Sequence, residues 1–327
     1  MAASFLYGQL FVRLPEPSGS RSGQTVVVTG SNVGLGKEAA RHFVRLGASK
    51  VILAVRNMKQ GAAAKRDIER TTQCPDQIIE VWQLDMASYA SVQAFAARIE
   101  SNLERLDTFI ANAGIAPAKY AVLEDNEASI TVNVVSTLLL SGLVLPKMKV
   151  TAGKFGTRPT LTITSSGVHG HTTVPQKSAP SGGLLRRIND KQTAEKYWAD
   201  QYPISKLLEV LAVRAIAGTH SGSTFPVTIN TVDPGLCHSE LGREFPTIAF
   251  WMIKAVLARS TEAGSRALVH AASSGVDSHG KYLSNCEITL PAPFVISADG
   301  KQVQDRVWSE LVQKLETIKP GVTGNFS

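Results

Sequence analysis

Cysteine is scarce in this chain, with only Cys74, Cys237 and Cys286 among its 327 residues. Their number is odd and their spacing is wide, which argues against a disulfide framework and against a zinc site. We therefore predict that the chain holds no metal. The same scarcity favours a reducing compartment, so we expect a cytoplasmic location.

Long apolar runs are also missing. No window approaches the roughly 18 uninterrupted apolar residues that a membrane span needs. The N-terminal stretch 5–12 is apolar, but it is short and lacks the basic start and small-residue cleavage site of a signal peptide. We interpret it as an arm that packs on the domain, and contact with a membrane surface is the alternative.

Dense basic tracts, internal repeats and low-complexity segments are absent as well. The net charge of +7 comes from 34 Lys and Arg against 27 Asp and Glu. The basic residues are spread out and are not interleaved with aromatic ones, which argues against a nucleic-acid partner. A modest positive charge suits an anionic ligand. Because composition never breaks, we predict an arm and linker over 1–24 and one catalytic domain over 25–327.

A glycine turn near the start of the chain is the strongest local signal. The β-branched run 25–29 leads into Gly30, Gly34 and Gly36, and a helix-forming sequence follows. A buried strand, a tight turn and a helix N-terminus in this order aim backbone N–H groups and the positive end of a helix dipole at an anion. Glycine also lets the backbone approach a pyrophosphate closely. The stretch predicts a dinucleotide site, and a generic α/β turn is the alternative.

Apolar strands alternate with helix-forming segments along the rest of the chain. This pattern is typical of a parallel sheet with helices on both faces. We predict an α/β fold: a doubly wound, parallel, seven-stranded sheet (Rossmann fold) in a single domain with an N-terminal arm and a C-terminal extension. A final helix over 302–318 should precede a polar tail. The predicted strands lie near 25–29, 50–55, 78–84, 106–111, 159–164, 227–232 and 281–283.

The second strand ends in a base and not in an acid, since Arg56 follows Val55. In dinucleotide folds an acid at this place binds the ribose 2′-hydroxyl, whereas a basic residue accommodates a 2′-phosphate. Arginine pairs with phosphate through two parallel hydrogen bonds. Arg56 therefore favours NADP over NAD, although it also fits the start of a solvated helix. Lys37 is a weaker second candidate for the phosphate.

A second strong signal is the pair Tyr202 and Lys206, which stand four residues apart on a predicted helix and so point the same way. A lysine ammonium near a phenol favours the phenolate and lowers its pKa. A tyrosine tuned in this way exchanges a proton with a carbonyl or alcohol oxygen. Ser166, next to Ser165 after the fifth strand, can donate to the developing oxyanion. Asn133 is a polar amide within a long apolar helix, and it needs a partner there.

Two features fit this pattern less well. Pro203 follows the tyrosine directly, so it favours a kink in the helix unless the helix starts close by. His169 and His171 lie between Ser166 and Tyr202. Because no further ligands cluster with them, we expect loop histidines and no metal.

The order Thr-Gly-x-x-x-Gly-x-Gly, Asn-Ala-Gly and Tyr-x-x-x-Lys resembles the short-chain dehydrogenase/reductase family. The resemblance implies that Tyr202 is the acid or base and that Lys206 lowers its pKa and holds the nicotinamide ribose. It further implies that Ser166 orients the substrate oxygen and that Asn133 holds a water of the proton relay. The cofactor-binding residues that we predict are Gly30, Ser31, Gly34, Leu35, Gly36, Lys37, Arg56, Asp85, Asn112, Gly114, Tyr202, Lys206, Val232, Pro234 and Gly235.

Within that family the chain is similar to the retinol-dehydrogenase-like branch, in its Ala-Val-Arg-Asn region and its long serine–tyrosine gap, and its arm resembles fungal members. The resemblance implies an NADP-dependent oxidoreductase that moves hydride between nicotinamide and a carbonyl or alcohol. The substrate would be a hydrophobic small molecule, such as a polyketide- or terpenoid-derived secondary metabolite.

The loop over 236–260 contains Leu236, Cys237, Leu241 and Phe245 and then the strongly apolar stretch 248–253, and we predict that it forms a lid over this substrate. A dimer face or a lipid contact is an alternative use of the same residues, so a homo-oligomer is left open. Two other functions stay open. One is the same fold carrying out a dehydration, isomerisation or cyclisation, and the other is a catalytically silent cofactor-sensing or partner-binding module.

Overall fold

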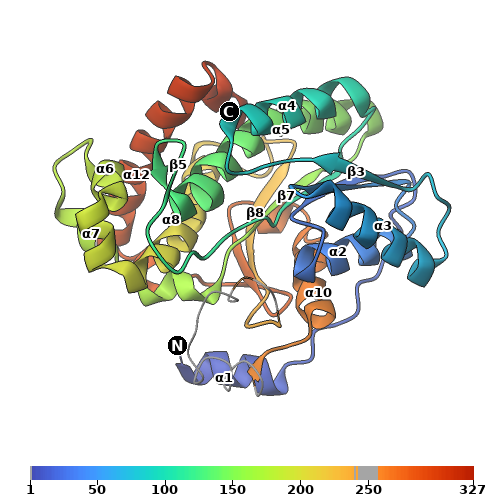
Figure 1. Ribbon diagram of the computed structural model, residues 1–327, viewed down its shortest axis with the longest axis horizontal. Helices are drawn as coiled ribbons and strands as arrows, with labels where there is room; N and C mark the ends of the chain where they lie inside the picture. The colour runs from blue at the N-terminus through green and yellow to red at the C-terminus, as the bar shows by residue number, and fades with distance from the viewer. Residues whose placement is uncertain (1, 239–240, 242–256) are drawn as a thin grey trace.

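An eight-stranded sheet forms the centre of the molecule (Figure 1). The computed structural model of the chain describes residues 2–238, 241 and 257–327. The strand order is β10-β9-β8-β7-β4-β1-β2-β3, and each neighbouring pair is parallel except β9 and β10. The strands are β1 (Thr25–Thr29), β2 (Lys50–Val55), β3 (Ile79–Gln83), β4 (Thr108–Ala111), β7 (Thr160–Thr164), β8 (Thr228–Asp233), β9 (Tyr282–Ser284) and β10 (Glu287–Thr289); β5 (Val122–Leu123) and β6 (Asn126–Glu127) form a separate hairpin.

The seven parallel strands confirm the predicted doubly wound α/β fold, and β10 is an addition that the sequence did not predict. A tight turn joins β10 to β9, with Asn285 and Cys286 both at positive φ (53° and 63°). Two residues at positive φ are the geometry of a type I′ hairpin turn, which usually carries Asn-Gly or Asp-Gly. Cysteine in the second position gives no turn signal in the sequence.

Helices cover both faces of the sheet, and two apolar cores result (Figure 1). The alternation is visible in β1, where Val27 joins one core while Val26 and Val28 join the other. One face carries α2 (Gly34–Arg45), α3 (Met58–Thr72) and α10 (Thr261–Ala271). The other carries α4 (Tyr89–Asn102), α5 (Thr137–Phe155), α8 (Trp198–Thr219) and α12 (Ala298–Ile318). The π-helix η1 (Ile130–Ser136) leads directly into α5.

Shorter elements occupy stretches that the sequence left irregular. The region between β7 and α8 contains the 3₁₀ turns η2 (Gly167–His171) and η3 (Pro175–Ser178) and the helices α6 (Leu184–Asn189) and α7 (Lys191–Lys196). The end of the chain contains η5 (Val276–Ser278), α11 (Pro293–Ile296) and η6 (Val322–Phe326). The predicted polar tail is wrong in one respect, because Val322 and Phe326 are buried against α5 and α12.

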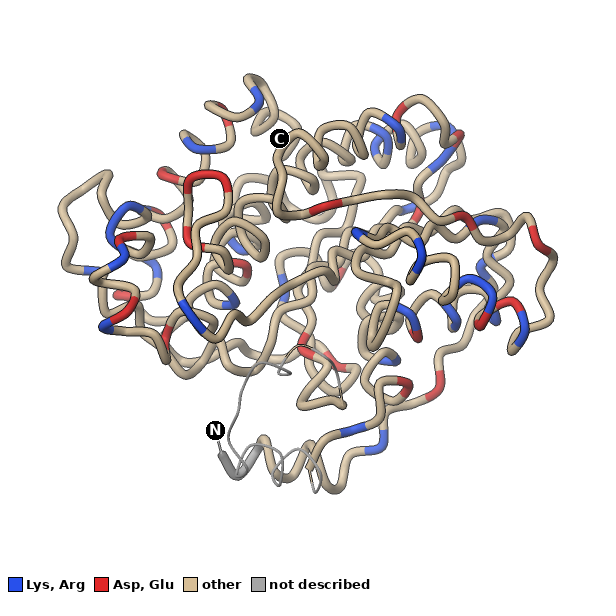
Figure 2. Tube along the Cα trace, in the orientation of Figure 1, with Lys and Arg blue, Asp and Glu red and all other residues tan. Residues whose placement is uncertain are grey.

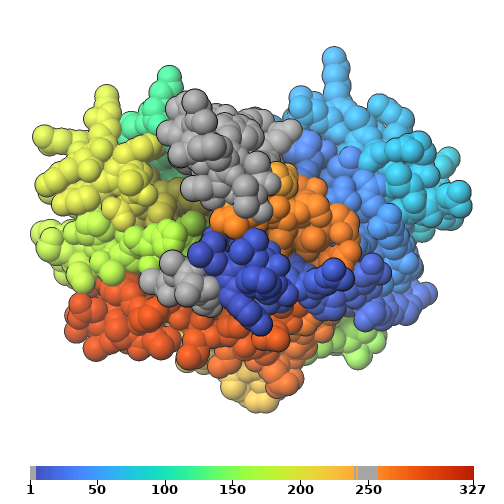
Figure 3. All heavy atoms as spheres, turned by 90° about the horizontal axis from the view of Figure 1, so that it is seen from below, coloured from blue at the N-terminus to red at the C-terminus, as the bar shows by residue number. Residues whose placement is uncertain are grey.

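The N-terminal arm packs on the domain, as predicted, but as a helix, α1 (Ala2–Phe11). Its Gln9 side chain donates to the carbonyls of Leu236 (2.9 Å) and Leu257 (2.8 Å) and accepts from the Leu236 N–H (3.2 Å). Figure 3 shows α1, in dark blue, on the surface beside the orange segment that leads into α10. Its large apolar side chains point outward, and Phe11 is 71% exposed.

One segment of the described chain, Ile130–Phe155, is long and apolar enough to cross a membrane, but 89% of its apolar window is buried inside the fold. It is therefore a core helix of this domain. Figure 2 shows basic and acidic residues interspersed along the described helices and loops, without a basic stripe.

Candidate active site

The glycine turn is built without room for side chains. Gly30 (φ +66°) and Gly34 (φ +60°) both take the left-handed conformation. A Cβ on Gly36 would lie 2.6 Å from the amide nitrogen of Asn112 and 2.6 Å from the Gly30 carbonyl oxygen. The N-cap of α2 is Val33, and no described side chain caps this helix. The N–H groups at its start are therefore available to an anion.

Thr29, Asn112 and Ala113 lock the turn to the neighbouring strand β4. The Thr29 hydroxyl accepts from the N–H groups of Asn112 (3.0 Å) and Ala113 (2.9 Å), and the Asn112 amide donates to the Thr29 carbonyl (3.0 Å). These bonds join two strand ends at the carboxyl edge of the sheet, where such folds bind ligands. The sequence predicted a role for Asn112, whereas the role of Thr29 was missed.

The residues predicted to bind the adenosine end of the cofactor differ in their surroundings. Arg56 is exposed at the end of β2, and Asn57 behind it caps α3. Lys37 forms an ion pair with Asp67 (2.6 Å), so its charge is already compensated inside the protein. Asp85 accepts from the Ala87 N–H (3.0 Å), and the hydroxyl of Ser31 turns inward to the Val28 carbonyl (2.8 Å).

The structure brings Ser166 and Tyr202 into hydrogen-bonding contact. Ser166 follows β7 as the N-cap of η2, where its hydroxyl accepts from the Val168 N–H (3.3 Å). Tyr202 lies in the second turn of α8, and Pro203 behind it is inside the helix. The start of this helix is held by Gln201, which donates to the buried carboxylate of Glu127 (3.2 Å).

Lys206 is buried one turn further along α8. Its ammonium donates to the Thr164 carbonyl (3.0 Å) and to the carboxylate of Glu209 (2.8 Å), and it lies 5.9 Å from the centre of the Tyr202 ring. Glu209 was not among the predicted residues. Its i,i+3 spacing from Lys206 on one helix was the available signal.

The electrostatics of Tyr202 differ from the sequence-based expectation. Burial raises the pKa of its phenol, the negative charges of Glu209 and Asp233 raise it further, and the hydrogen bond with Ser166 lowers it. Lys206 was expected to lower this pKa. It has no such effect in this structure, where its ammonium is paired with the Glu209 carboxylate.

Asn133 lies within η1, and other protein groups satisfy the hydrogen-bonding atoms of its side chain. Its side-chain oxygen accepts from the Ile115 N–H (2.9 Å), and its amide donates to the Ile115 carbonyl and to the Ser205 hydroxyl (both 2.9 Å). A Cβ on Gly114 would lie 3.2 Å from the Asn133 oxygen and 3.5 Å from the Lys206 nitrogen. Asn133 therefore ties the loop after β4 to α8, next to Lys206. Short π-helical segments within helices, such as η1, are frequent at functional sites.

The turn after β8 completes the site. Val232 is buried in β8, and the Gly235 N–H donates to the Asp233 carboxylate (2.9 Å) after Pro234. Gly235 has φ +76° and lies directly against the Gln9 oxygen of α1.

Most of the predicted lid over 236–260 lies outside the described residues. Its two ends are joined by backbone bonds, from His238 to the Arg259 carbonyl and from Arg259 to the Leu236 carbonyl (both 2.9 Å).

His169 has a structural role beside Ser166. The Ala292 N–H donates to its Nε2 (2.9 Å), so its proton sits on Nδ1, which lies 2.8 Å from the Ser166 carbonyl oxygen. Burial lowers the pKa of this ring. Within residues 2–238, 241 and 257–327, no group of three or more His, Cys, Asp or Glu is placed to hold a metal ion. No disulfide joins Cys74, Cys237 and Cys286.

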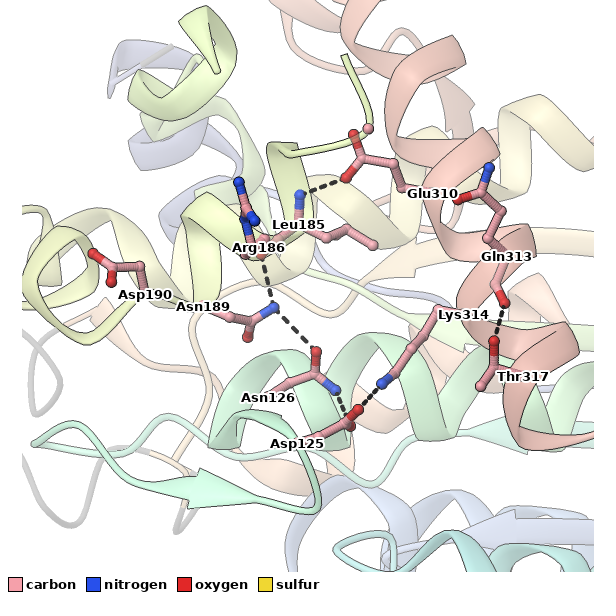
Figure 4. A pocket seen from close by; sticks show the side chains of 11 residues that line it. Asp125, Asn126, Leu185, Arg186, Asn189, Asp190, Glu310, Gln313, Lys314 and Thr317 are labelled. Atoms are coloured by element: carbon pink, nitrogen blue, oxygen red, sulfur yellow. Dashed lines mark hydrogen bonds and ion pairs between the residues drawn. The ribbon is translucent and has the colours of Figure 1, made fainter. Parts of the chain in front are cut away.

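A polar cavity of about 490 Å³ lies away from this site, between the β5–β6 hairpin, α6 and α12 (Figure 4). Its walls are joined to each other, since Lys314 pairs with Asp125 and Asn189 donates to Asn126 (3.1 Å). None of the predicted catalytic residues lines it. A polar, self-satisfied cavity of this kind does not match the apolar substrate site that the sequence predicts.

Comparison with known proteins shows which protein family the chain matches. A family model described as short chain dehydrogenase matches residues 24–179. The chain is 70% identical over 322 residues to the short chain dehydrogenase/reductase dmxR8 of Cryptosporiopsis sp., with 98% of this chain and 99% of that protein covered. It is 43% identical over 287 residues to the short chain dehydrogenase atnD of Emericella nidulans, with 86% and 90% covered. These relatives confirm the resemblance to fungal members, and the retinol-dehydrogenase-like branch stays a prediction.

Solved structures share the fold at low sequence identity. A short chain dehydrogenase of Shigella flexneri complexed with NADP aligns with a TM-score of 0.56 and 21% identity, over 81% of this chain and 98% of that one. A 3-ketoacyl-(acyl-carrier-protein) reductase of Brucella melitensis complexed with NADH aligns with a TM-score of 0.60 and 19% identity, over 81% and 97%. At these identities the likeness shows the α/β fold alone.

Proposed function

Because the chain belongs to the short-chain dehydrogenase/reductase family of oxidoreductases, we propose that it is an NADPH-dependent enzyme that interconverts a carbonyl and an alcohol on a hydrophobic small molecule. The observation that carries the proposal is the contact of Ser166 with Tyr202 one helical turn from Lys206, at the same sheet edge as the glycine turn. Neither half alone would support it, since glycine turns and Tyr-x-x-x-Lys pairs each occur in other settings.

The residues of the turn fit a dinucleotide. Gly30 and Gly36 are closely packed and bring no side chain to the start of α2. The uncapped N-terminus of this helix suits a pyrophosphate. Exposed Arg56 is placed at the strand end where a 2′-phosphate is recognised. When bound, the reduced cofactor would supply a hydride for carbonyl reduction, and the oxidised cofactor would accept one in alcohol oxidation.

The chain's own residues handle the proton. In reduction Tyr202 gives its phenolic proton to the substrate oxygen, and in oxidation the phenolate takes the proton back. Ser166 donates a hydrogen bond to the oxygen as negative charge develops on it. Lys206 supplies positive charge beside the phenol, and Asn133 fixes the loop after β4 against the helix that carries both residues.

The substrate class rests on sequence and on resemblance. The stretch 248–253, in the segment after Gly235, is strongly apolar, which suits a hydrophobic ketone, aldehyde or alcohol. Fungal relatives at up to 70% identity favour a secondary-metabolite intermediate of polyketide or terpenoid origin.

The first experiment measures cofactor binding to the purified protein by fluorescence titration, with NADPH and with NADH. Arg56→Ala should weaken NADPH binding about tenfold or more, the loss of roughly one bidentate charged contact, and leave NADH binding in place. Arg66→Ala on the exposed side of α3 is the matched control and should bind as the wild type does. Equal affinity for both cofactors in the wild type would contradict the assignment of Arg56.

The second experiment separates redox chemistry from the alternatives. NADPH absorbance is followed while a panel of hydrophobic ketones and aldehydes is converted, with Tyr202→Phe alongside. We expect NADPH consumption that Tyr202→Phe abolishes. Product formation without loss of NADPH would favour a dehydration, isomerisation or cyclisation, and binding without any conversion would favour a cofactor-sensing module.

A further inference from the structure

A buried carboxylate stands behind the catalytic lysine. Glu209 is 2% exposed and Lys206 is 4% exposed, and their charged groups are 2.8 Å apart. Burying an ion pair is costly unless the remaining polar atoms are also satisfied. Here they are not, because Oε2 of Glu209 accepts no hydrogen bond from any residue that the structure describes. Ser165 is the polar neighbour of this carboxyl, but it gives its proton to the Lys206 carbonyl (2.9 Å).

An orphaned carboxylate oxygen in the interior has a chemical meaning. Such an atom is unfavourable when charged and is relieved when the carboxyl takes up a proton. Burial raises the pKa of Glu209 to about 7, against the opposing effects of Lys206 and of the Ser165 hydroxyl. The carboxyl therefore changes charge near neutral pH.

The surroundings leave Glu209 in control of the local charge. On α8 itself it faces Lys206 and Tyr202. From the sheet, β8 contributes Asp233, whose carboxylate also acts on Tyr202, and the uncharged Ser165 directly follows β7. From η2 comes His169, whose ring is buried and has a lowered pKa. Among the described residues of η1 and α12, the side chains that bond to α8 are the uncharged amides of Asn133 and Gln304.

We propose that Glu209 is a positioning residue of the reaction: its charge state decides whether the positive charge of Lys206 is cancelled inside the protein or acts on Tyr202. This inference rests on the proposed function, since it concerns how that acid is tuned. With Glu209 protonated, Lys206 is uncompensated and Tyr202 is a stronger acid. With Glu209 ionised, the pair is neutral and Tyr202 is a weaker acid. Carbonyl reduction should therefore slow as pH rises through neutrality.

The kinetic test is the pH profile of kcat for ketone reduction. In the wild type we expect a step of about three- to tenfold between pH 6 and pH 8, which is the size that one pKa unit of acid strength gives under partial proton transfer. Glu209→Gln should remove the step, and Glu209→Asp should restore it. Glu310→Gln is the matched control, because Glu310 is also a buried carboxylate but holds the N–H groups of Leu184 and Leu185. A step that persists in Glu209→Gln would overturn the proposal.

A second measurement needs neither substrate nor cofactor. Protein labelled with carbon-13 at the glutamate carboxyls is titrated by NMR. One resonance should titrate near neutral pH, vanish in Glu209→Gln, persist in Glu310→Gln, and move to higher pH in Lys206→Met, where the attracting charge is gone. If no glutamate titrates near neutrality, the proposal is wrong even when the enzyme is active. If NADPH does not bind and this titration is present, the proposed function fails and the role of Glu209 as partner of Lys206 stands.

Discussion

Gly36 is the residue whose replacement should damage the site most directly. Its missing Cβ would overlap the Asn112 side-chain amide and the Gly30 carbonyl, both 2.6 Å away. The Gly30 oxygen belongs to the backbone, and the Asn112 amide is held by its hydrogen bond to the Thr29 carbonyl. Overpacking of a rigid site costs about 1–3 kcal/mol. We expect Gly36→Ala to lower the free energy of unfolding by that amount and to weaken NADPH binding about tenfold or more, as measured by denaturant unfolding and fluorescence titration.

Gly153→Ala is the control for this change. Gly153 lies on the exposed side of α5, and a Cβ there meets nothing within 4 Å. The substitution should stabilise the protein by about 0.5–1 kcal/mol, because alanine loses less backbone entropy in a helix. Cofactor binding that survives Gly36→Ala unchanged would contradict the close packing of the turn.

Asp67 should govern part of the acid stability. Hydrogen bonds from Lys37, Arg41 and Arg70 hold the pKa of its carboxyl well below the usual range. A carboxyl whose pKa is lowered by folding stabilises the protein at pH values above its pKa in the unfolded chain, near 4. This stabilisation is lost as the pH falls below that value. Asp67→Asn should therefore cost about 1 kcal/mol at pH 7 and progressively less below pH 4. Urea unfolding at pH 7 and pH 3 measures the gap, and a gap that does not shrink in acid would contradict it.

Among the elements, α1 packs as the sequence indicates, but its contact with the turn after β8 was not predicted. Gln9 bridges Leu236, directly after the turn that follows β8, and Leu257, shortly before α10. In Gln9→Glu the donor is replaced by a carboxylate that faces two carbonyl oxygens. An unsatisfied pairing of this kind costs about 1–3 kcal/mol. We expect a lower melting temperature and a raised KM for the cofactor, because the turn beside Gly235 is no longer held.

The matched control for this change is the exposed Gln77. Gln77→Glu should leave both the melting temperature and the KM as in the wild type. A Gln9→Glu variant that loses stability but keeps its KM would mean that α1 supports the fold without positioning the turn.

Elements with a strong local signal were predictable, and those made by distant contacts were not. The parallel strands β1 and β2 are nearly continuous runs of β-branched and apolar residues, and the turn at Gly30 carries its glycines in sequence. The β9–β10 hairpin escaped because Cys286 occupies the place of a glycine. The partnership of Lys206 with Glu209 escaped because i,i+3 pairs of this kind are usually solvated, and only the fold shows that this one is buried.

At the scale of the whole molecule, both chain ends are structural. Phe326 is 4% exposed, packs against the Trp308 ring (centroids 5.7 Å apart) and lies close to Gly142 of α5. We expect Phe326→Ala to lower the free energy of unfolding by about 3 kcal/mol or more, since a buried ring leaves a cavity. Phe11→Ala, at a residue that is 71% exposed, should cost little. Equal losses in the two variants, measured by denaturant unfolding, would contradict the burial of the C-terminus.

The contact between α1 and the turn after β8 also sets an order of events during synthesis. Gln9 and Leu236 are 227 positions apart, so the helix leaves the ribosome long before its partner exists. At about 5–20 residues per second, the wait is roughly 11–45 s. For that time the Gln9 side chain lacks the backbone groups of residues 236 and 257 with which it bonds in the folded domain. The contact between α1 and this turn therefore forms only after most of the sheet has been synthesised.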